Sequence, residues 1–96
     1  MERNLEELRE QIDAIDREMV ALFKARMAVC GEVAEYKRDK GLPVLAADRE
    51  QVLLAKISEQ AGEDLADYAV SVYRAILSAS RAHQCSLLGL EPEKRE

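Results

Sequence analysis

The sequence is poor in residues that interrupt helices and in large aromatic residues. In 96 residues it holds two prolines, four glycines, one phenylalanine and no tryptophan. Together with 48% hydrophobic and 34% charged residues, this composition is typical of a helix-rich globular protein rather than of a disordered or β-rich one. The length allows one domain at most, and a domain this small gains from the extra core that a partner subunit supplies.

Cysteine and histidine are also scarce. Cys30 and Cys85 lie far apart in the sequence, and His83 is the single histidine. This spacing predicts neither a disulfide framework nor a zinc site, so no metal is expected. Both cysteines are interpreted as small residues of the core, because free cysteine is often buried.

Long apolar runs and an excess of positive charge are absent as well. No run approaches the roughly 20 residues of a membrane span, and residues 1–7 lack the apolar block of a signal peptide, so the sequence predicts a cytoplasmic protein that does not associate with membranes. The net charge of −5 argues against nucleic acid as a partner. Any anionic ligand must therefore be held by a local group of positive residues.

What the sequence does contain is helical periodicity. Apolar residues recur at alternating spacings of three and four, which predicts one long helix that ends at Gly41 and Pro43. The apolar stripe of this helix, called the seam below, consists of Leu5, Leu8, Ile12, Ile15, Met19, Leu22, Val29, Val33 and Tyr36.

Two further helices are predicted after this one. A short helix is expected from about Ala47 to Ala61 and ends at Gly62, and a medium one runs from Leu65 to about Leu88 with Asp64 as its N-cap. Their apolar stripes are formed by Leu54, Ile57 and Ala61 in the second helix and by Ala69, Val72 and Ile76 in the third. Residues 1–88 thus make an all-α domain, and residues 89–96 a polar tail.

The length of the first helix bears on assembly. Roughly 36 residues at 1.5 Å each span about 54 Å, whereas a compact chain of this size has a radius of gyration of only about 12 Å. Half of the helix would project into water with its seam bare, which is unusual for a soluble monomer. We therefore expect an intertwined, all-helical homodimer.

Two basic residues interrupt the first helix on its inward side. Arg26 stands where the seam should continue, and no acid lies three or four positions away. An unpaired buried guanidinium costs several kcal/mol, so an anion is expected to meet it, unless Arg26 only sets the register of the seam. Lys37 lies close to three full turns later on nearly the same side, again without a nearby acid; alternatively it is a solvated surface lysine.

Polar residues interrupt the other two helices in the same way. Glu50 falls in line with the apolar stripe of the second helix without a cation at its helical neighbours, although a carboxylate there also suits the helix dipole. Ser80 and Gln84 continue the stripe of the third helix at spacings of four. Uncompensated polar groups on the inward faces of all three helices predict a polar site walled by a helical bundle.

These polar positions belong to segments that resemble a known family. The segments are residues 8–13 with Asp16, Arg26, residues 32–37, Pro43 with Val44, residues 48–50, and Ser80 with Gln84. From Leu5 to about Leu87 the chain resembles the all-helical chorismate mutases of the AroQ class. The resemblance implies an isomerase that rearranges chorismate to prephenate without a cofactor, in the biosynthesis of phenylalanine and tyrosine.

The resemblance also implies the roles of individual residues. Arg9, Arg26 and Ser80 would bind the two substrate carboxylates, Lys37 and Gln84 the ether oxygen, and Glu50 the ring hydroxyl, with Arg49 supporting that end. Lys37, Gln84 and Glu50 are the expected catalytic residues. In one departure, Ala46 stands where many relatives place an acid, so the ring-hydroxyl contact made there is not expected, and Asp48 does not inherit it.

Arg9 requires a second chain. It precedes Arg26 by 17 residues, which places it about 26 Å away along the helix and turned by about 100°. In an antiparallel pairing of two first helices, Arg9 of one chain approaches Arg26 and Lys37 of the other. Without the resemblance, Arg9 would be a surface residue that pairs with Glu6 or Asp13.

Two alternatives remain beside the mutase. One is an isochorismate pyruvate-lyase of the same fold, against which Arg49, Glu50 and Gln84 favour the mutase. The other is a helical dimerisation module without catalytic chemistry, in which Arg26 and Lys37 could be exchanged for alanine or leucine without loss of function.

Overall fold

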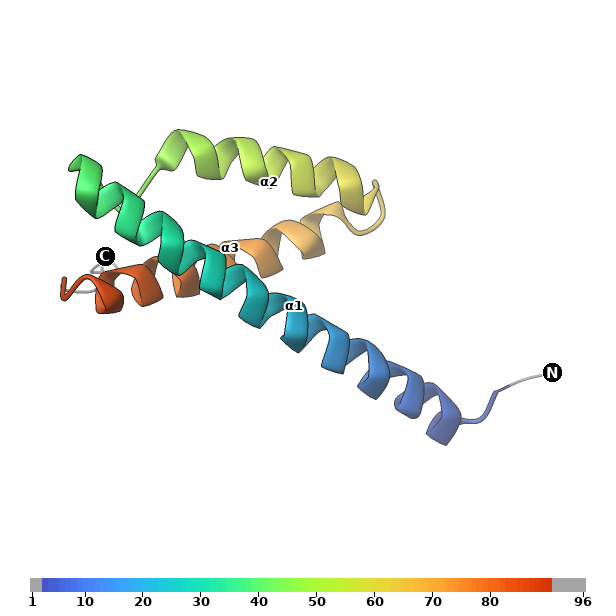
Figure 1. Cartoon of the computed structure of the whole chain (residues 1–96). Coiled ribbons are helices and arrows are strands. Elements are labelled where there is room, and N and C mark those ends of the chain that lie inside the picture. Colours follow the sequence, from blue (N-terminus) through green and yellow to red (C-terminus); the bar gives the residue numbers. More distant parts are fainter. Residues whose placement is uncertain (1–2, 91–96) are drawn as a thin grey trace.

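A computed structural model of the chain, described here for residues 3–90, contains three helices and no strand within that range. They are α1 (Leu5–Lys40), α2 (Ala47–Ala61) and α3 (Ala66–Leu87), joined by short loops (Figure 1). The predicted all-α fold of one long, one short and one medium helix is confirmed. Of the predicted polar tail, residues 91–96 lie outside the described residues.

The ends of α1 follow from local chemistry. At its start the side chain of Asn4 accepts a hydrogen bond of 2.8 Å from the backbone N–H of Glu7, which satisfies one of the free N–H groups of the first turn. At its end Gly41 takes a left-handed conformation with φ of 68°, and its N–H bonds back to the last turn. The predicted boundary at Gly41 is therefore confirmed.

The predicted start of α3 is wrong in its cap. Asp64 does not cap the helix; Leu65 is the N-cap residue, and no side chain bonds to the first turn. Asp64 lies inside a turn in which the backbone N–H of Leu65 bonds to the carbonyl of Gly62 at 3.2 Å. Because of this turn α3 begins at Ala66, one residue later than predicted, and Asp64 precedes the N-cap position.

Helices α1 and α2 each pack on α3 rather than on each other. Small residues bring α1 close to α3 near the C-terminal half of α3 (Figure 1). Ala34 is fully buried, and a Cβ atom added to Gly31 would lie 3.2 Å from Leu87 Cδ1. The gap between α1 and α2, floored by α3, is where the candidate site lies.

The buried face of α3 lies further along the helix than predicted. Its buried residues are Leu77, Ser80, Gln84 and Cys85. Of the predicted stripe, Val72 is exposed, and Ala69 and Ile76 are half-buried, because the crossing with α1 covers only the later turns. The interpretation of Cys85 as a core residue is confirmed.

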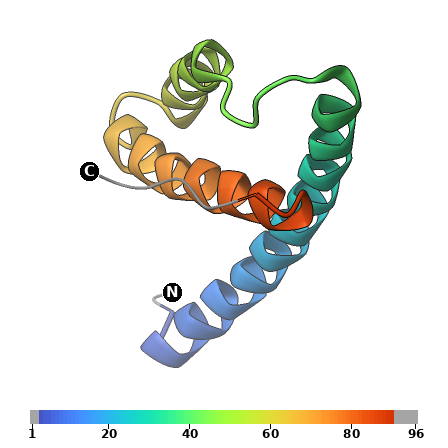
Figure 2. The same ribbon diagram turned by 90° about the vertical axis from the view of Figure 1, so that its left-hand side faces the viewer.

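The N-terminal half of α1 extends beyond the other helices (Figure 2). The chain is 58 Å long and its radius of gyration is 16.7 Å, against about 12 Å for a compact chain of this length. The seam residues Leu5, Leu8, Ile12, Ile15, Met19 and Leu22 are all exposed. The bare seam predicted for a single chain is therefore present.

Within residues 3–90, no helix combines the length and apolar character needed to cross a membrane.

Candidate active site

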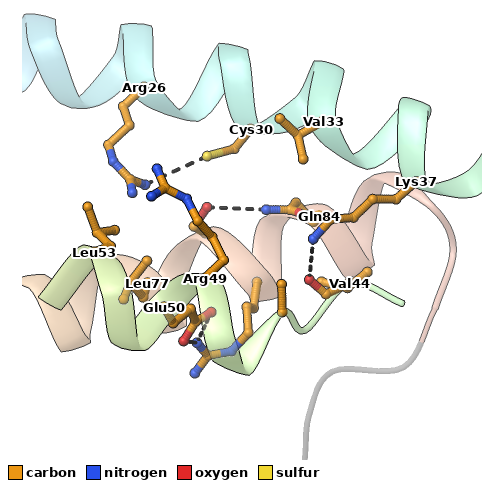
Figure 3. Close-up of a pocket in the computed structure, with 13 residues that line it drawn as sticks. Arg26, Cys30, Val33, Lys37, Val44, Arg49, Glu50, Leu53, Leu77 and Gln84 are labelled. Carbon is orange, nitrogen blue, oxygen red and sulfur yellow. Dashed lines mark hydrogen bonds and ion pairs between the residues drawn. The ribbon is translucent and has the colours of Figure 1, made fainter. Parts of the chain in front are cut away.

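A cavity of about 190 Å³ lies between the three helices and the loop that precedes α2 (Figure 3). Its charged lining residues are Arg26 and Lys37 from α1, Arg49 and Glu50 from α2, and Arg81 from α3; Ser80 and Gln84 add a hydroxyl and an amide. Apolar side chains, among them Val33, Leu53 and Leu77, separate these groups. The cavity therefore collects four cationic side chains and one carboxylate. Six of the seven predicted site residues line this cavity, namely Arg26, Lys37, Arg49, Glu50, Ser80 and Gln84. Arg81 lines it as well, and the sequence analysis did not predict it.

Arg26 faces the cavity beside Cys30, one turn later on α1. Its Nη1 donates to Cys30 Sγ at 3.7 Å, and sulfur is a weak acceptor. Among the described side chains no carboxylate pairs with Arg26, so most of its donors are available to an anion. Cys30 itself is half-buried and lines the cavity, so its interpretation as a core residue is wrong. Its position beside the cavity could have been predicted from its spacing, because it follows Arg26 by four residues and so lies on the same face of α1.

Lys37 stands at the other end of the cavity. Its Nζ donates a hydrogen bond of 2.7 Å to the carbonyl oxygen of Val44, in the loop before α2. A lysine ammonium has three donors, and this bond uses one of them. The bond holds the ammonium at the cavity, because the lining also includes Val44. The reading of Lys37 as a solvated surface residue does not agree with this half-buried position.

Ser80 and Gln84 form the floor on α3. They are 3% and 7% exposed, and Gln84 Nε2 donates to Ser80 Oγ at 3.4 Å. The other amide atom, Gln84 Oε1, is buried and has no hydrogen-bond partner within the described range. A buried acceptor without a partner is costly. The floor is therefore a polar surface that a ligand with hydrogen-bonding groups satisfies better than an apolar one.

The sequence suggested that Glu50 has no cation beside it, and this prediction is wrong. Arg81 Nη1 donates to Glu50 Oε1 at 2.5 Å and to Oε2 at 2.7 Å, and the two side chains are only 19% and 22% exposed. The cation comes from another helix, 31 residues away, and helical neighbours alone cannot reveal it. The only signal for Arg81 in the sequence is its spacing, four residues after Leu77 and three before Gln84, which puts it on the same face of α3.

Three further positions from the sequence analysis differ in their relation to the cavity. Arg9 is exposed on the projecting half of α1 and is not among the residues that line the cavity, so one chain does not bring it to the site. Ala46 does line the cavity, where it presents a methyl group in place of a carboxylate. Arg49 is exposed, and its guanidinium points into the cavity from α2 (Figure 3).

This arrangement suits the binding of a small dianion by orientation and charge. Arginine and lysine donors form short, charge-assisted hydrogen bonds with carboxylates. Apolar side chains such as Val33, Leu53 and Leu77 lie between these groups, and a lower local dielectric strengthens such bonds. In residues 3–90, His, Cys, Asp and Glu side chains form no group of three that could hold a metal ion.

Comparisons with known proteins agree with this chemistry. Residues 8–85 match the family described as chorismate mutase type II. The chain is 35% identical over 83 residues to a T-protein of Haemophilus influenzae, an alignment that covers 83% of this chain and 22% of the relative. It is 32% identical over 80 residues to a bifunctional chorismate mutase/prephenate dehydratase of Aquifex aeolicus, which covers 78% of this chain and 22% of the relative.

A shorter relative aligns over most of its own length. The chain is 27% identical over 86 residues to a chorismate mutase of Methanocaldococcus jannaschii, which covers 88% of this chain and 87% of the relative. By contrast, the chain spans about a fifth of the T-protein and of the bifunctional relative. No solved structure matches the chain significantly.

Proposed function

The chain belongs to the chorismate mutase type II family, and on this premise we propose that it rearranges chorismate to prephenate without a cofactor. The observation that carries the proposal is that Arg26, Lys37, Ser80 and Gln84, from two different helices, line the same cavity. We propose that it does so in the cytoplasm, as a step in the biosynthesis of aromatic amino acids.

Binding comes first in the proposed mechanism. Arg26 and the Ser80 hydroxyl bind carboxylate oxygens of chorismate, since the Arg26 guanidinium has no carboxylate partner within the described residues. Holding both carboxylates of the substrate selects a compact conformer in which the two reacting carbons approach each other. Such orientation supplies a large part of the rate enhancement of a reaction that occurs within one molecule.

The reaction itself breaks the ether carbon–oxygen bond while a carbon–carbon bond forms in the same molecule. Negative charge grows on the ether oxygen as the bond breaks. The two donors of Lys37 that are not used by Val44 can meet this oxygen, and they stabilise the transition state more than the ground state. No proton transfer is required, so no general base is needed.

Gln84 is the second donor to the ether oxygen. In the structure its Nε2 bonds to Ser80 and its Oε1 has no partner in the described part of the chain. The amide nitrogen carries two N–H groups and the bond to Ser80 uses one of them, so the second can donate to the ether oxygen while the Ser80 O–H stays available for a substrate carboxylate.

Glu50 accepts a hydrogen bond from the ring hydroxyl in this proposal. The first turn of α2 holds it at the cavity next to Arg49, whose guanidinium supports the same end of the substrate. Ala46 offers no polar group there. Glu50 is therefore the acceptor on which binding of the ring hydroxyl depends.

A second copy of the chain completes the proposed site. The bare seam on α1 gives two chains a surface on which to pair, and the exposed apolar side chains along it favour association. In an antiparallel pairing of α1 with its copy, Arg9 of one protomer approaches Arg26 of its partner and adds a further cation for the substrate carboxylates. The proposed active form is thus an intertwined homodimer.

The direct test follows the loss of chorismate absorbance with purified protein and identifies the product by nuclear magnetic resonance. Prephenate as the product is the expected result. A second assay offers isochorismate and measures pyruvate release, which reports lyase activity. Turnover of isochorismate alone would replace the mutase by the lyase, and turnover of neither substrate by a dimeric, folded protein would support a dimerisation module.

A further inference from the structure

We propose that Arg81 is a positioning residue that holds the Glu50 carboxylate in the place where it accepts the ring hydroxyl of the substrate. The inference rests on the proposed function and goes beyond it, because it concerns a residue that acts through Glu50. Its basis is the ion pair between α2 and α3 on the wall of the cavity (Figure 3).

The geometry of the pair restricts Glu50. A single nitrogen, Arg81 Nη1, donates to both carboxylate oxygens, at 2.5 and 2.7 Å. Both side chains are about four-fifths buried, so the pair is shielded from the solvent that weakens surface ion pairs. A glutamate side chain has three rotatable torsions, and these bonds select one arrangement of them.

The first turn of α2 lacks a side-chain cap. Its N-cap residue, Ala46, makes no side-chain hydrogen bond to the first turn, so the helix lacks the usual cap. Glu50 lies in this first turn and is bonded through its backbone N–H to the carbonyl of Ala46 at 3.0 Å. The Arg81 pair therefore ties the uncapped end of α2 to α3 through the side chain that the substrate needs.

The composition of the lining makes this position critical. Glu50 is the only carboxylate among the described residues that line the cavity, and Ala46 leaves no acid beside it. A carboxylate has four lone-pair sites, and Arg81 occupies one on each oxygen. The remaining sites can accept a hydroxyl while Arg81 stays bound.

Arg81 also forms part of a wall. An adjoining hollow of about 240 Å³ shares Glu50, Leu77 and Arg81 with the candidate site, and its other lining residues are Leu54, Arg74 and Ser78. A short side chain at position 81 would join the two spaces and admit water, which would reduce activity for a reason unrelated to Glu50. The test therefore uses methionine and lysine, which preserve the length of the side chain.

The experiment compares chorismate with its analogue in which hydrogen replaces the ring hydroxyl. For Arg81→Met we expect kcat/KM to fall roughly 10-fold to 100-fold with chorismate, as for the loss of a charge-assisted hydrogen bond, and to stay within about twofold of the wild type with the analogue. Arg81→Lys should recover part of the loss. In a Glu50→Gln background, Arg81→Met should cause no further loss with chorismate.

The outcomes separate the inference from the proposed function. Wild-type protein that turns over neither chorismate nor the analogue would overturn both. Active wild-type protein in which Arg81→Met loses the same factor with both substrates would overturn the inference alone, because Arg81 would then bind the carboxylates directly or support the fold. Arg74→Met, an exposed arginine on the same helix, is the matched control and should leave kcat/KM unchanged.

Discussion

The ammonium group of Lys37 and the carbonyl oxygen of Val44 are 2.7 Å apart, so the last turn of α1 is tied to the loop that leads into α2. This bond keeps the charge of Lys37 at the cavity before any ligand arrives. Electrostatic groups that are fixed in advance need no rearrangement during the reaction, which is where their contribution to catalysis arises.

Lys37→Ala should therefore lower kcat strongly. We expect a loss of roughly 100-fold to 1,000-fold, the range found when one preorganised donor to a developing negative charge is removed. The measurement is chorismate turnover by absorbance, with circular dichroism to show that the helices are retained. Lys56→Ala, an exposed lysine of α2, is the control. Full turnover by the Lys37 variant would remove Lys37 from the site.

Arg26→Ala should act mainly on substrate binding. Loss of charge-assisted hydrogen bonds to a carboxylate lowers kcat/KM by roughly 100-fold. Because Arg26 has no carboxylate partner in the described structure, its removal should leave the unfolding temperature unchanged or raise it. Arg38→Ala, an exposed change on the same helix, should affect neither quantity. Unchanged kcat/KM for Arg26→Ala would favour a role in register alone.

Mixing subunits tests the shared site. Arg9→Ala and Lys37→Ala proteins should each be nearly inactive, since every site in either homodimer lacks one group. A hybrid of the two has one site with both substitutions and one site with neither, so refolding an equal mixture should restore about a quarter of wild-type activity if chains pair at random. Hybrids that form, as mass spectrometry under native conditions would show, but remain inactive would refute the contribution of Arg9 across the interface.

The seam gives a prediction about assembly. Leu22 is 70% exposed in the single chain, and Leu22→Glu would place a charge on the surface that we expect a second copy to cover. The variant should sediment as a monomer at concentrations where the wild type is a dimer, and its turnover should fall with it. Val52→Glu is the control, because it makes the same kind of substitution at an exposed apolar residue of α2 outside the seam, and this variant should stay dimeric. A monomeric wild type would contradict the proposed assembly.

Cys30 gives a chemical probe of the cavity. Its thiol is half-buried beside Arg26, whereas Cys85 is only 6% exposed. Alkylation by iodoacetamide should modify Cys30 first, as peptide mass spectrometry can show, and should reduce turnover in proportion. A Cys30→Ala variant should resist the inhibition, and chorismate should slow the labelling of the wild type. Complete labelling of Cys30 with full activity would place the thiol away from the bound substrate.

Much of the fold could be predicted because helix ends and apolar stripes are local properties. Gly41 ends α1 in a left-handed conformation that other residues rarely adopt, and the spacing of three and four predicted the whole length of the helix. The prediction that Asp64 caps α3 was wrong because aspartate is common both at helix N-caps and in turns. Here Asp64 lies in the turn that begins at Gly62, and Leu65 is the N-cap residue.

The site was predicted less completely, for a physical reason. Arg26, Ser80 and Gln84 could be predicted to line a polar site because each interrupts an apolar stripe on its own helix. Lys37 could be predicted because it lies on nearly the same side of α1 as Arg26, and all four line the cavity. The partner of Glu50 could not, since Arg81 meets it only when α3 packs on α2. Arg9 lies exposed on the projecting half of α1, away from the cavity, so a single chain does not test its predicted contribution across an interface.

The long helix α1 has a consequence for how the length of this protein can change in evolution. Leu22 of the exposed seam and Arg26 of the cavity wall lie one turn apart on it. Inserting or deleting one residue within a helix rotates everything beyond that point by about 100°. Such a change would turn either the seam or the cavity wall out of alignment, so insertions and deletions among relatives are expected in the loops at residues 41–46 and 62–65 rather than within α1.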